Sequence, residues 1–467
     1  MNTRSYSALF LSVCFSLYFS PIAFAQLILP PLSVDFTVDG QLLRNPNVGG
    51  LNAPQICKVD LNNNGTDDLF IFDRTGDVVL TFINEGTANE VDYQYNPYYI
   101  RNFPRIANWA LLRDFNNDGA MDIYAYSDVP GIDGVLVYEG YYQSDELHFK
   151  RFNFYDSPKH LIYFDLPTGG MTQLYVSTED YPEVTDVNYD GDLDFVTFGN
   201  GGGYIHYYEN QSVELGYGTD SLIYGLVTTC FGGAYESGLT GCLDLSGSID
   251  TCYTGLLGSG DDRHAGSTLL MFDNDNDNDK ELWLGDVNTP TVVMLTNGGN
   301  NQSTWWTDQD CNFPTSNVSA QVYNFPANFY LDVDNDGKND FIVAPNADKN
   351  SEDDQNVWFY KNTTDNENPV FAFQKSTLFV EDMIDMGSGS KPIFVDYNAD
   401  GLLDIIAGNE SFYVIGGAKD SRLFLYENIG SATTPAYELV DDDYLNMSQF
   451  SGSNWSFAPC AGDLDND

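Results

Sequence analysis

A nine-residue segment near the start of the chain could bind a cation. In residues 60–68, DLNNNGTDD, oxygen-bearing side chains stand at positions 1, 3, 5 and 9, and glycine stands at position 6. Calcium takes about six to eight hard oxygen ligands in a flexible geometry. Alternate side chains of a tight loop can reach one centre, glycine lets the backbone turn sharply, and position 7 can add its carbonyl. One match alone is also typical of an ordinary turn.

The same pattern occurs six times in full. The copies, named loops 1 to 6, begin at residues 60, 114, 186, 273, 332 and 396, and DLDND at 463–467 begins a seventh. An ordinary turn needs only one or two of these residues, so six copies in register predict metal loops. The candidate ligands are Asp60, Asn62, Asn64, Asp68, Asp114, Asn116, Asp118, Asp122, Asp186, Asn188, Asp190, Asp194, Asp273, Asp275, Asp277, Glu281, Asp332, Asp334, Asp336, Asp340, Asp396, Asn398, Asp400, Asp404, Asp463, Asp465 and Asp467.

Calcium (Ca2+), about one ion per complete loop, is the expected cofactor because magnesium demands a stricter octahedron and keeps more water. An EF-hand is excluded, since position 12 of the six loops is never acidic. Loop 4 has Asn278 where glycine is expected, and asparagine tolerates a left-handed backbone better than most residues. By carboxylate count, loops 4 and 5 should bind most tightly and loop 1 least.

The segments around each loop predict strands. Loop 6, for example, follows KPIFVD and precedes DIIAG, and two further strand-like segments, LFLYENIGS and TPAYELV, come after it. Four strands per unit, repeating every 54 to 87 residues between complete loops, are typical of a β-propeller, with a flat solenoid as the alternative. We therefore expect an all-β fold, a β-propeller of four-stranded antiparallel blades, with six complete blades plus the start of a seventh.

The pattern D-x-[DN]-x-[DN]-G-x-x-D, followed by an apolar strand, resembles the FG-GAP/VCBS repeat of integrin-α-type propellers. The segments NQSVELGYGTDSLIY, RHAGST and NSEDDQNVWFYKN resemble, more particularly, secreted VCBS-repeat proteins of the Bacteroidetes. The resemblance covers most of residues 45–467. It implies that each loop connects the first two strands of a blade and binds calcium, and it says little about activity.

Composition and the N-terminus place the protein outside the cytoplasm. The formal net charge of −50 disfavours binding to nucleic acid and to anionic lipid. Residues 1–25 combine Arg4, an apolar stretch and an Ala23-Phe24-Ala25 cleavage site, which is typical of a signal peptide rather than of a membrane anchor. The propeller is then expected over residues 26–467, secreted or at the cell surface, with no integral membrane segment after signal cleavage.

Cysteines are concentrated in one part of the mature chain. Six remain after signal cleavage, which allows 15 pairings, and Cys230, Cys242 and Cys252 lie in a Gly/Ser/Cys-rich insertion around residues 214–265. We expect at least one local disulfide there. The insertion could carry a binding site, or it could be an elaborated loop without a ligand.

Catalytic signatures are weak, so no catalytic residue is assigned. The four histidines, His148, His160, His206 and His264, accompany no G-x-S-x-G elbow. Trp305 and Trp306 could stack on a sugar, but packing is favoured. Two classes of function remain: a non-catalytic binding or adhesion module for an extracellular glycan or protein ligand, and an extracellular polysaccharide hydrolase or lyase. The missing nucleophile favours the first class.

The end of the sequence interrupts the repeat. DLDND lacks the glycine, the position-9 carboxylate and the following strand of a complete loop. Because a propeller closes only when its last blade meets its first, we expect the intact protein to continue with the rest of a seventh blade. The resemblance further implies a C-terminal sorting domain for type IX secretion. The alternative is a six-bladed ring with a short tail.

Overall fold

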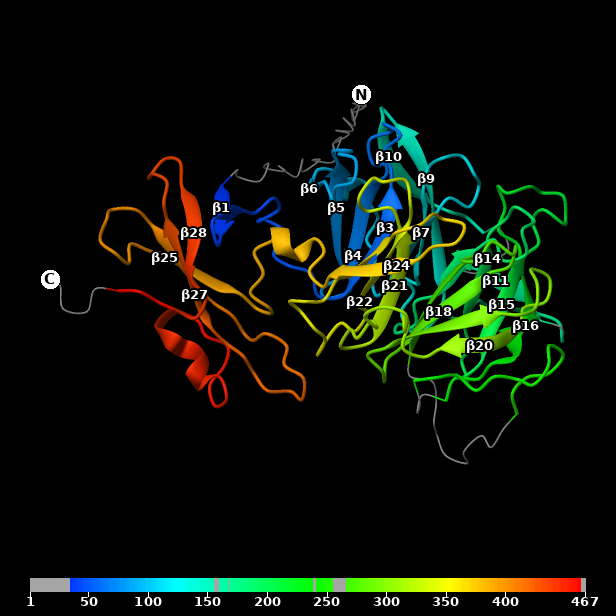
Figure 1. Ribbon diagram of the computed structural model, residues 1–467. Helices are drawn as coiled ribbons and strands as arrows, with labels where there is room; N and C mark the ends of the chain where they lie inside the picture. The colour runs from blue at the N-terminus through cyan, green and yellow to red at the C-terminus, as the bar shows by residue number, and fades with distance from the viewer. Residues whose placement is uncertain (1–33, 155–158, 167, 238–240, 255–265, 463–467) are drawn as a thin grey trace, which may run out of the picture. The chain divides into compact units, whose positions relative to one another are not determined.

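The computed structural model describes residues 34–154, 159–166, 168–237, 241–254 and 266–462. Over these residues the chain forms 28 strands and four short 3-10 helices, so the predicted all-β fold class is confirmed (Figure 1). The predicted signal peptide, His264 and the predicted seventh loop at Asp463, Asp465 and Asp467 lie outside the described residues. None of the helices in the described part of the chain is long and apolar enough to cross a membrane.

Five sheets have four antiparallel strands each, in the order of the sequence. Sheet 1 consists of β3 (Pro54–Val59), β4 (Asp68–Asp73), β5 (Val78–Asn84) and β6 (Tyr93–Tyr95). Sheet 2 consists of β7 (Ala110–Arg113), β8 (Asp122–Tyr126), β9 (Val135–Gln143) and β10 (Glu146–Arg151). Sheet 3 consists of β13 (Glu183–Thr185), β14 (Asp194–Phe198), β15 (Ile205–Asn210) and β16 (Tyr224–Thr228).

Sheets 4 and 5 repeat the same order. Sheet 4 consists of β17 (Ser267–Phe272), β18 (Glu281–Asp286), β19 (Val292–Asn297) and β20 (Trp306–Asp310). Sheet 5 consists of β21 (Pro326–Leu331), β22 (Asp340–Pro345), β23 (Trp358–Asn362) and β24 (Phe371–Lys375). The remaining small elements are β11 (Tyr163–Asp165), β12 (Met171–Gln173), η1 (Tyr99–Asn102), η2 (Phe231–Gly233), η3 (Val380–Asp382) and η4 (Tyr444–Phe450).

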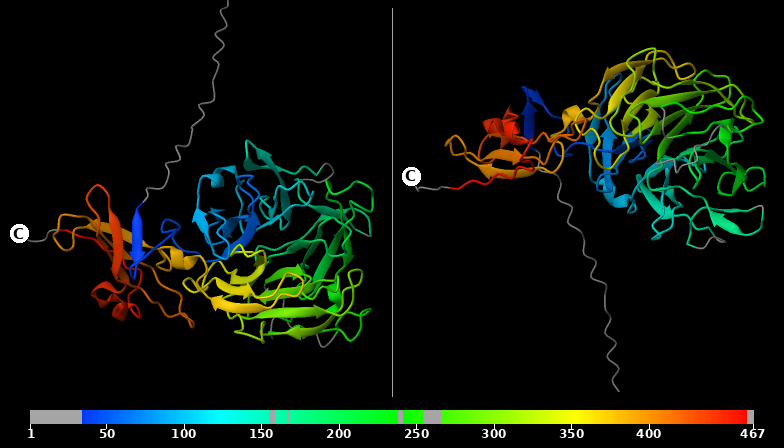
Figure 2. Two further views of the ribbon diagram at one scale, coloured as in Figure 1. Left: turned by 45° about the horizontal axis from the view of Figure 1, so that its top comes forward. Right: turned by 90° about the horizontal axis from the view of Figure 1, so that it is seen from below.

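Sheet 6 has two strands more than each of sheets 1 to 5. Its strands β25 (Lys391–Val395), β26 (Asp404–Gly408), β27 (Leu423–Asn428) and β28 (Ala436–Asp441) are antiparallel neighbours. The N-terminal strands β1 (Asp35–Val38) and β2 (Gln41–Leu42) extend the sheet, with β1 parallel to β28. Figures 1 and 2 show the blue β1 beside the red β28, although 400 residues separate Thr37 from Tyr437, whose carbonyl accepts the Thr37 hydroxyl.

The buried strands have the sequences that their surroundings require. In β4, β14, β18 and β22 every residue is buried, and these strands are nearly continuous apolar runs. Runs of this kind suit strands that are covered on both faces, whereas a strand with one wet face alternates between apolar and polar residues. β25 differs, because its Phe394 is 62% exposed.

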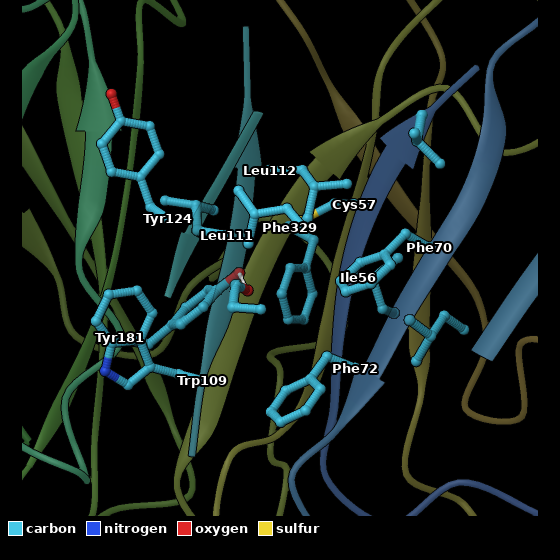
Figure 3. Close-up of a cluster of buried hydrophobic side chains, with 14 of the residues drawn as sticks. Ile56, Cys57, Phe70, Phe72, Trp109, Leu111, Leu112, Tyr124, Tyr181 and Phe329 are labelled. Carbon is cyan, nitrogen blue, oxygen red and sulfur yellow. Dashed lines mark hydrogen bonds between the residues drawn. The ribbon is translucent and has the colours of Figure 1, made fainter. Parts of the chain in front are cut away.

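The first strands of sheets 1 to 5 form a connected series. β3 contacts both β7 and β21, and β17 contacts both β13 and β21. Arg113 of β7 completes the series by donating to the Val184 carbonyl of β13 at 2.9 Å. Figure 3 shows Ile56 of β3, Leu111 of β7 and Phe329 of β21 in one core, and Tyr181, two residues before β13, belongs to the same core. The sequence did not indicate that sheet 5 would contact sheet 1.

Both disulfides lie around the predicted insertion. Cys230 bonds to Cys252, which confirms a local disulfide, and Cys242 bonds to Cys311 just beyond β20. The range 214–265 also includes β16, so the added segment follows the fourth strand of sheet 3. Gln309 of β20 exchanges two hydrogen bonds with the Leu243 backbone, at 2.9 and 3.0 Å. The segment thereby covers the outer strand of sheet 4, which would otherwise be an open edge.

The two disulfides should contribute unequally to stability. The Cys242–Cys311 bond spans 69 residues and the Cys230–Cys252 bond spans 22. Constraint of the unfolded chain then predicts losses of about 4 and about 3 kcal/mol, respectively, when each pair is replaced by serine. Urea unfolding of the two double variants measures the difference. An equal loss, or a larger one for the shorter loop, would contradict this expectation.

Candidate metal loops

All six complete loops connect the first and second strands of a sheet, as the resemblance implied. Loop 1 joins β3 to β4 and loop 6 joins β25 to β26, and position 9 is always the first residue of the second strand. Strand pairing therefore holds the ends of each loop on adjacent strands. The sequence-predicted ligands of each loop are brought together on one short connection.

The position-1 aspartate folds each loop around its own carboxylate. In loop 2, Asp114 accepts the backbone N–H groups of Asp118 and Gly119 at 3.2 and 2.9 Å. Loops 1, 3, 5 and 6 repeat both bonds, and loop 4 uses positions 4 and 6 instead. The position-5 side chain accepts the N–H of position 7 in all six loops, at 2.7 to 3.1 Å.

Two residues of every loop have a left-handed backbone. At position 6 the glycines and Asn278 all have positive φ, and Asn278 lies at 68°, so its predicted tolerance is confirmed. Position 4 is also left-handed in all six loops, which the sequence analysis did not anticipate. Asparagine, which tolerates a left-handed backbone better than most residues, occupies position 4 in four of the loops. Tyr189 and Ala399 occupy it in the other two, with φ of 62° and 61°.

The position-9 carboxylate fastens the loop to the third strand. All six of these side chains are 0% exposed. In loop 2, Asp122 accepts the N–H of Phe115 at 2.9 Å and that of Gly140, on the third strand, at 2.7 Å. The other five loops make the same two bonds, and there the third-strand donor is always an asparagine that ends the strand.

Sequence reasoning missed these asparagines, which are Asn84, Asn210, Asn297, Asn362 and Asn428. In loops 1, 4 and 6 their side chains also donate to the position-8 carbonyl. Sheet 2 has Gly140 instead, where a Cβ would lie 2.2 Å from the Met121 carbonyl oxygen. The signal was present in the sequence as a polar residue and asparagine ending the third strand, as in YYEN, YKN and YEN.

Electrostatics disfavour the ionised position-9 carboxylates of loops 1 to 5 in the absence of a cation. Burial raises the pKa of Asp68 to about 6, that of Asp340 to about 7, and those of Asp122, Asp194 and Glu281 to about 8. The two backbone N–H donors lower each pKa in part, and carboxylates of the same loop raise it further. A bound cation would reverse this preference by stabilising the charged form.

The donor sets fit a hard cation. Asp273, Asp275 and Glu281 of loop 4 place carboxylate oxygens within 4.8 Å of one another, and Asp332, Asp334 and Asp340 of loop 5 do the same. Loops 1, 2, 3 and 6 have an asparagine amide at position 3, so they hold fewer acids at positions 1, 3, 5 and 9 than loops 4 and 5 do. Loops 1, 3, 4 and 5 each contain at least one buried oxygen that lacks a hydrogen-bond donor among the described residues: Asn62 Oδ1, Asp190 Oδ2, Asp192 Oδ1, Asp279 Oδ1 and Asp334 Oδ1.

A residue of the third strand also reaches three of the loops. It is the residue just before the strand-end asparagine. Glu209 lies 3.3 Å from the Asn188 amide of loop 3, and Glu427 lies 3.5 Å from the Asn398 amide of loop 6. In loop 5 the same position is Lys361, whose ammonium contacts Asp334 and lies 2.9 Å from Asp336. The sign of the charge beside the loop therefore differs between sheets.

A cavity of about 540 Å³ lies beside loop 3. It is lined by loop 3, by the ends of β15 and β16, by the segment closed by the Cys230–Cys252 disulfide, and by the β19–β20 hairpin. Aromatic, amide and acidic side chains meet there, including Tyr207, Phe231, Asn300, Gln302 and Glu209. Gln302 donates to the Asn188 carbonyl at 3.2 Å, so the hairpin contacts the loop directly.

The remaining candidates of the sequence analysis have structural surroundings. Trp306 is fully buried against Phe231, which confirms packing, and Trp305 is partly buried and donates to the Ser246 carbonyl at 3.4 Å. His206 lies 3.3 Å from the Tyr208 hydroxyl, and burial lowers its pKa. His148 lies 3.9 Å from Glu146. Neither of these two contacts places a histidine beside a serine or cysteine that it could activate as a general base.

Comparison with known proteins supports the repeat. Residues 332–407, from position 1 of loop 5 to β26, match the model of the FG-GAP-like repeat. No curated protein matches the chain. Similar solved structures include an Agrocybe aegerita lectin that recognises non-reducing terminal N-acetylglucosamine, with 15% identity, 85% of this chain and 82% of that chain covered, and a TM-score of 0.30.

Two further solved structures are similar at the same level. The Tc holotoxin pore of Photorhabdus luminescens is 13% identical over 78% of this chain and 13% of that chain, with a TM-score of 0.29. A protein from Lactobacillus plantarum is 10% identical over 84% of this chain and 96% of that chain, with a TM-score of 0.29. The chain contains an FG-GAP-like repeat within a series of four-stranded antiparallel sheets, and is a repeat β-propeller.

Proposed function

We propose that the protein is a secreted or surface-displayed propeller, stabilised by calcium, that binds an extracellular glycan or protein ligand without catalysing a reaction. The two disulfides fit an oxidising compartment. In the loops, the side chains of positions 1, 3, 5 and 9 would hold the ion. When bound, calcium supplies positive charge that offsets the repulsion among these carboxylates.

The cavity beside loop 3 is the observation that carries the binding function. Its volume of about 540 Å³ lies in the range of ligand sites, and its walls come from four separate segments of the chain. Phe231 and Tyr207 supply aromatic surface, while Asn300 and Gln302 supply donors and acceptors. A sugar residue or a polar peptide side chain needs this combination of a flat apolar face and nearby polar groups.

Rigidity of the walls supports a binding role. The Cys230–Cys252 disulfide fixes one wall, and loop 3 fixes another through the bonds of Asp186 and Asp194 to the backbone. A pre-organised pocket loses less conformational entropy on binding than a flexible one does. Calcium in loop 3 would therefore support ligand affinity indirectly, by keeping the wall in place.

A glycan array in calcium and in chelator tests the proposal. Retention of defined glycans in calcium, weakened by chelation and without product release, is the expected result. A protein ligand would give no retention on the array, and crosslinking to proteins from a cell surface would then be the readout. Turnover of a polysaccharide by the purified chain would instead support the hydrolase or lyase class.

Blocking the cavity should reduce ligand retention without reducing stability. Ile249 lines the cavity and is 42% exposed, so Ile249→Trp adds bulk at the opening without disturbing the core. We expect at least a tenfold loss of affinity, about 1.4 kcal/mol. Val318→Trp, at a residue that is 49% exposed and does not line the cavity, is the matched control. Equal affinity of both variants, measured by titration calorimetry, would place the ligand elsewhere.

A further inference from the structure

The charge next to loop 5 is the opposite of the charge next to loops 3 and 6. Lys361 on β23 precedes the strand-end Asn362, as Glu427 on β27 precedes Asn428. The register of the two sheets is the same. Phe341 and Ile405 directly follow position 9 of their loops, and they pair with Tyr360 and Tyr426, respectively. Lys361 and Glu427 therefore occupy equivalent positions beside their loops.

Lys361 contacts two of the four side chains that a loop cation would contact. Its ammonium lies against the Asp334 carboxylate at position 3 and 2.9 Å from Oδ2 of Asp336 at position 5. Both aspartate side chains are only 7% exposed, and the lysine side chain is 27% exposed. A buried carboxylate pair needs a positive partner, and a lysine ammonium is a compact point charge that can serve as one.

We propose that Lys361 is the built-in counter-ion of loop 5, so that the lysine ammonium fills this loop and the loop takes no calcium in the native protein. This assignment reverses the ranking by carboxylate count, which placed loop 5 among the tightest sites. The ammonium and calcium would compete for the same two aspartates. The same charge effect acts in the opposite direction at loops 3 and 6. There Glu209 and Glu427 add negative charge beside the loop, which raises the affinity for calcium.

Removing the lysine should convert loop 5 into a calcium site. Asp334 keeps one buried oxygen, Oδ1, without a hydrogen bond, and Asp332, Asp334 and Asp340 already place oxygens within 4.8 Å of one another. In Lys361→Gln the Asp334 carboxylate would lose its positive partner. The inference rests on the proposed function only in assuming that calcium is the cation that the other loops bind.

Equilibrium dialysis of the purified mature chain against calcium tests the proposal. Lys361→Gln is expected to bind one more calcium ion per chain than the wild type at saturating calcium. Lys338→Gln is the matched control, because Lys338 lies 3.9 Å from Asp336 but does not contact Asp334. The reciprocal Glu427→Lys variant should bind one ion fewer than the wild type.

The outcomes separate this inference from the proposed function. Equal numbers of ions in wild type and Lys361→Gln at saturating calcium would overturn the inference. A wild type that binds no calcium would overturn the calcium part of the proposed function, while a gain of one ion in Lys361→Gln would still support the role of the lysine. If Lys361→Gln folds only in calcium, the proposal is supported. If Lys361→Gln folds neither with nor without calcium, the Glu427→Lys variant becomes the test. A Glu427→Lys variant that binds as many calcium ions as the wild type would overturn the proposal.

Discussion

Removing calcium with a chelator should lower the melting temperature of the protein on the order of 10 °C. When free calcium is at about 100 times the dissociation constant of a site, binding stabilises the native state by about 2.7 kcal/mol. Three such sites would already contribute about 8 kcal/mol. For a chain of this length that stabilisation corresponds to roughly 10 °C. Differential scanning calorimetry in chelator, and then with calcium restored, measures the effect.

The physical reason is the concentration of acid in each loop. Loop 4 carries five acids in nine residues, at positions 1, 3, 5, 7 and 9. Asp279 at position 7 is buried, and burial together with Asp277 raises its pKa to about 6. In chelator these groups repel one another within a short loop, and they oppose the compact state. Calcium removes that penalty and should restore the melting temperature more completely than magnesium does.

General screening must be separated from specific binding. A chain with a formal net charge of −50 gains stability from any added salt, because counter-ions weaken the repulsion across its surface. Sodium chloride at matched ionic strength is therefore the control. A melting temperature that responds equally to sodium, magnesium and calcium, or that does not change in chelator, would contradict a structural role for calcium.

The features predicted from the sequence are those that local chemistry determines. The strands after the loops, the turn at position 6 and the clustering of positions 1, 3, 5 and 9 each depend on residues within about ten positions. Asn278 is an example: the sequence predicted that asparagine could replace glycine at position 6, and Asn278 has the same left-handed backbone as the glycines of the other loops.

The unpredicted features depend on contacts between distant residues. β1 pairs with β28 across 400 residues, and no local pattern in residues 35–38 indicates that partner. Lys361 lies 27 residues from Asp334, so its contact with loop 5 depends on the register of β22 and β23. Counting carboxylates within nine-residue windows could not detect a lysine that arrives from the next strand.

The strained position 4 illustrates a third limit. Tyr189 and Ala399 occupy a left-handed conformation that their side chains disfavour, while asparagine fills the same position in loops 1, 2, 4 and 5. The hydrogen bonds of Asp186 and Asp396 to positions 5 and 6 impose that backbone. The loop conformation therefore depends on the whole set of bonds more than on the preference of any single residue.

Position 9 should matter for stability even in the absence of calcium, and Asp122→Ala should show this most clearly. Asp122 is 0% exposed and accepts the N–H groups of Phe115 and Gly140 at 2.9 and 2.7 Å. Alanine would leave two buried donors without partners, each costing about 1–3 kcal/mol. We expect a loss of about 4 kcal/mol in chelator, measured by urea unfolding.

The matched control is Asp118→Ala at position 5 of the same loop. Asp118 is exposed, and its hydrogen bonds with Ala120 and Asn116 stay within the loop, so its loss in chelator should be about 1 kcal/mol or less. In calcium, both variants should also lose the stabilisation that loop 2 gains from the ion. The position-9 carboxylate would then have two functions: it would bind the ion, and its hydrogen bonds would hold the loop against the third strand. A loss near zero for Asp122→Ala in chelator would show that Asp122 acts only through the metal, and that the bonds to Phe115 and Gly140 add nothing of their own.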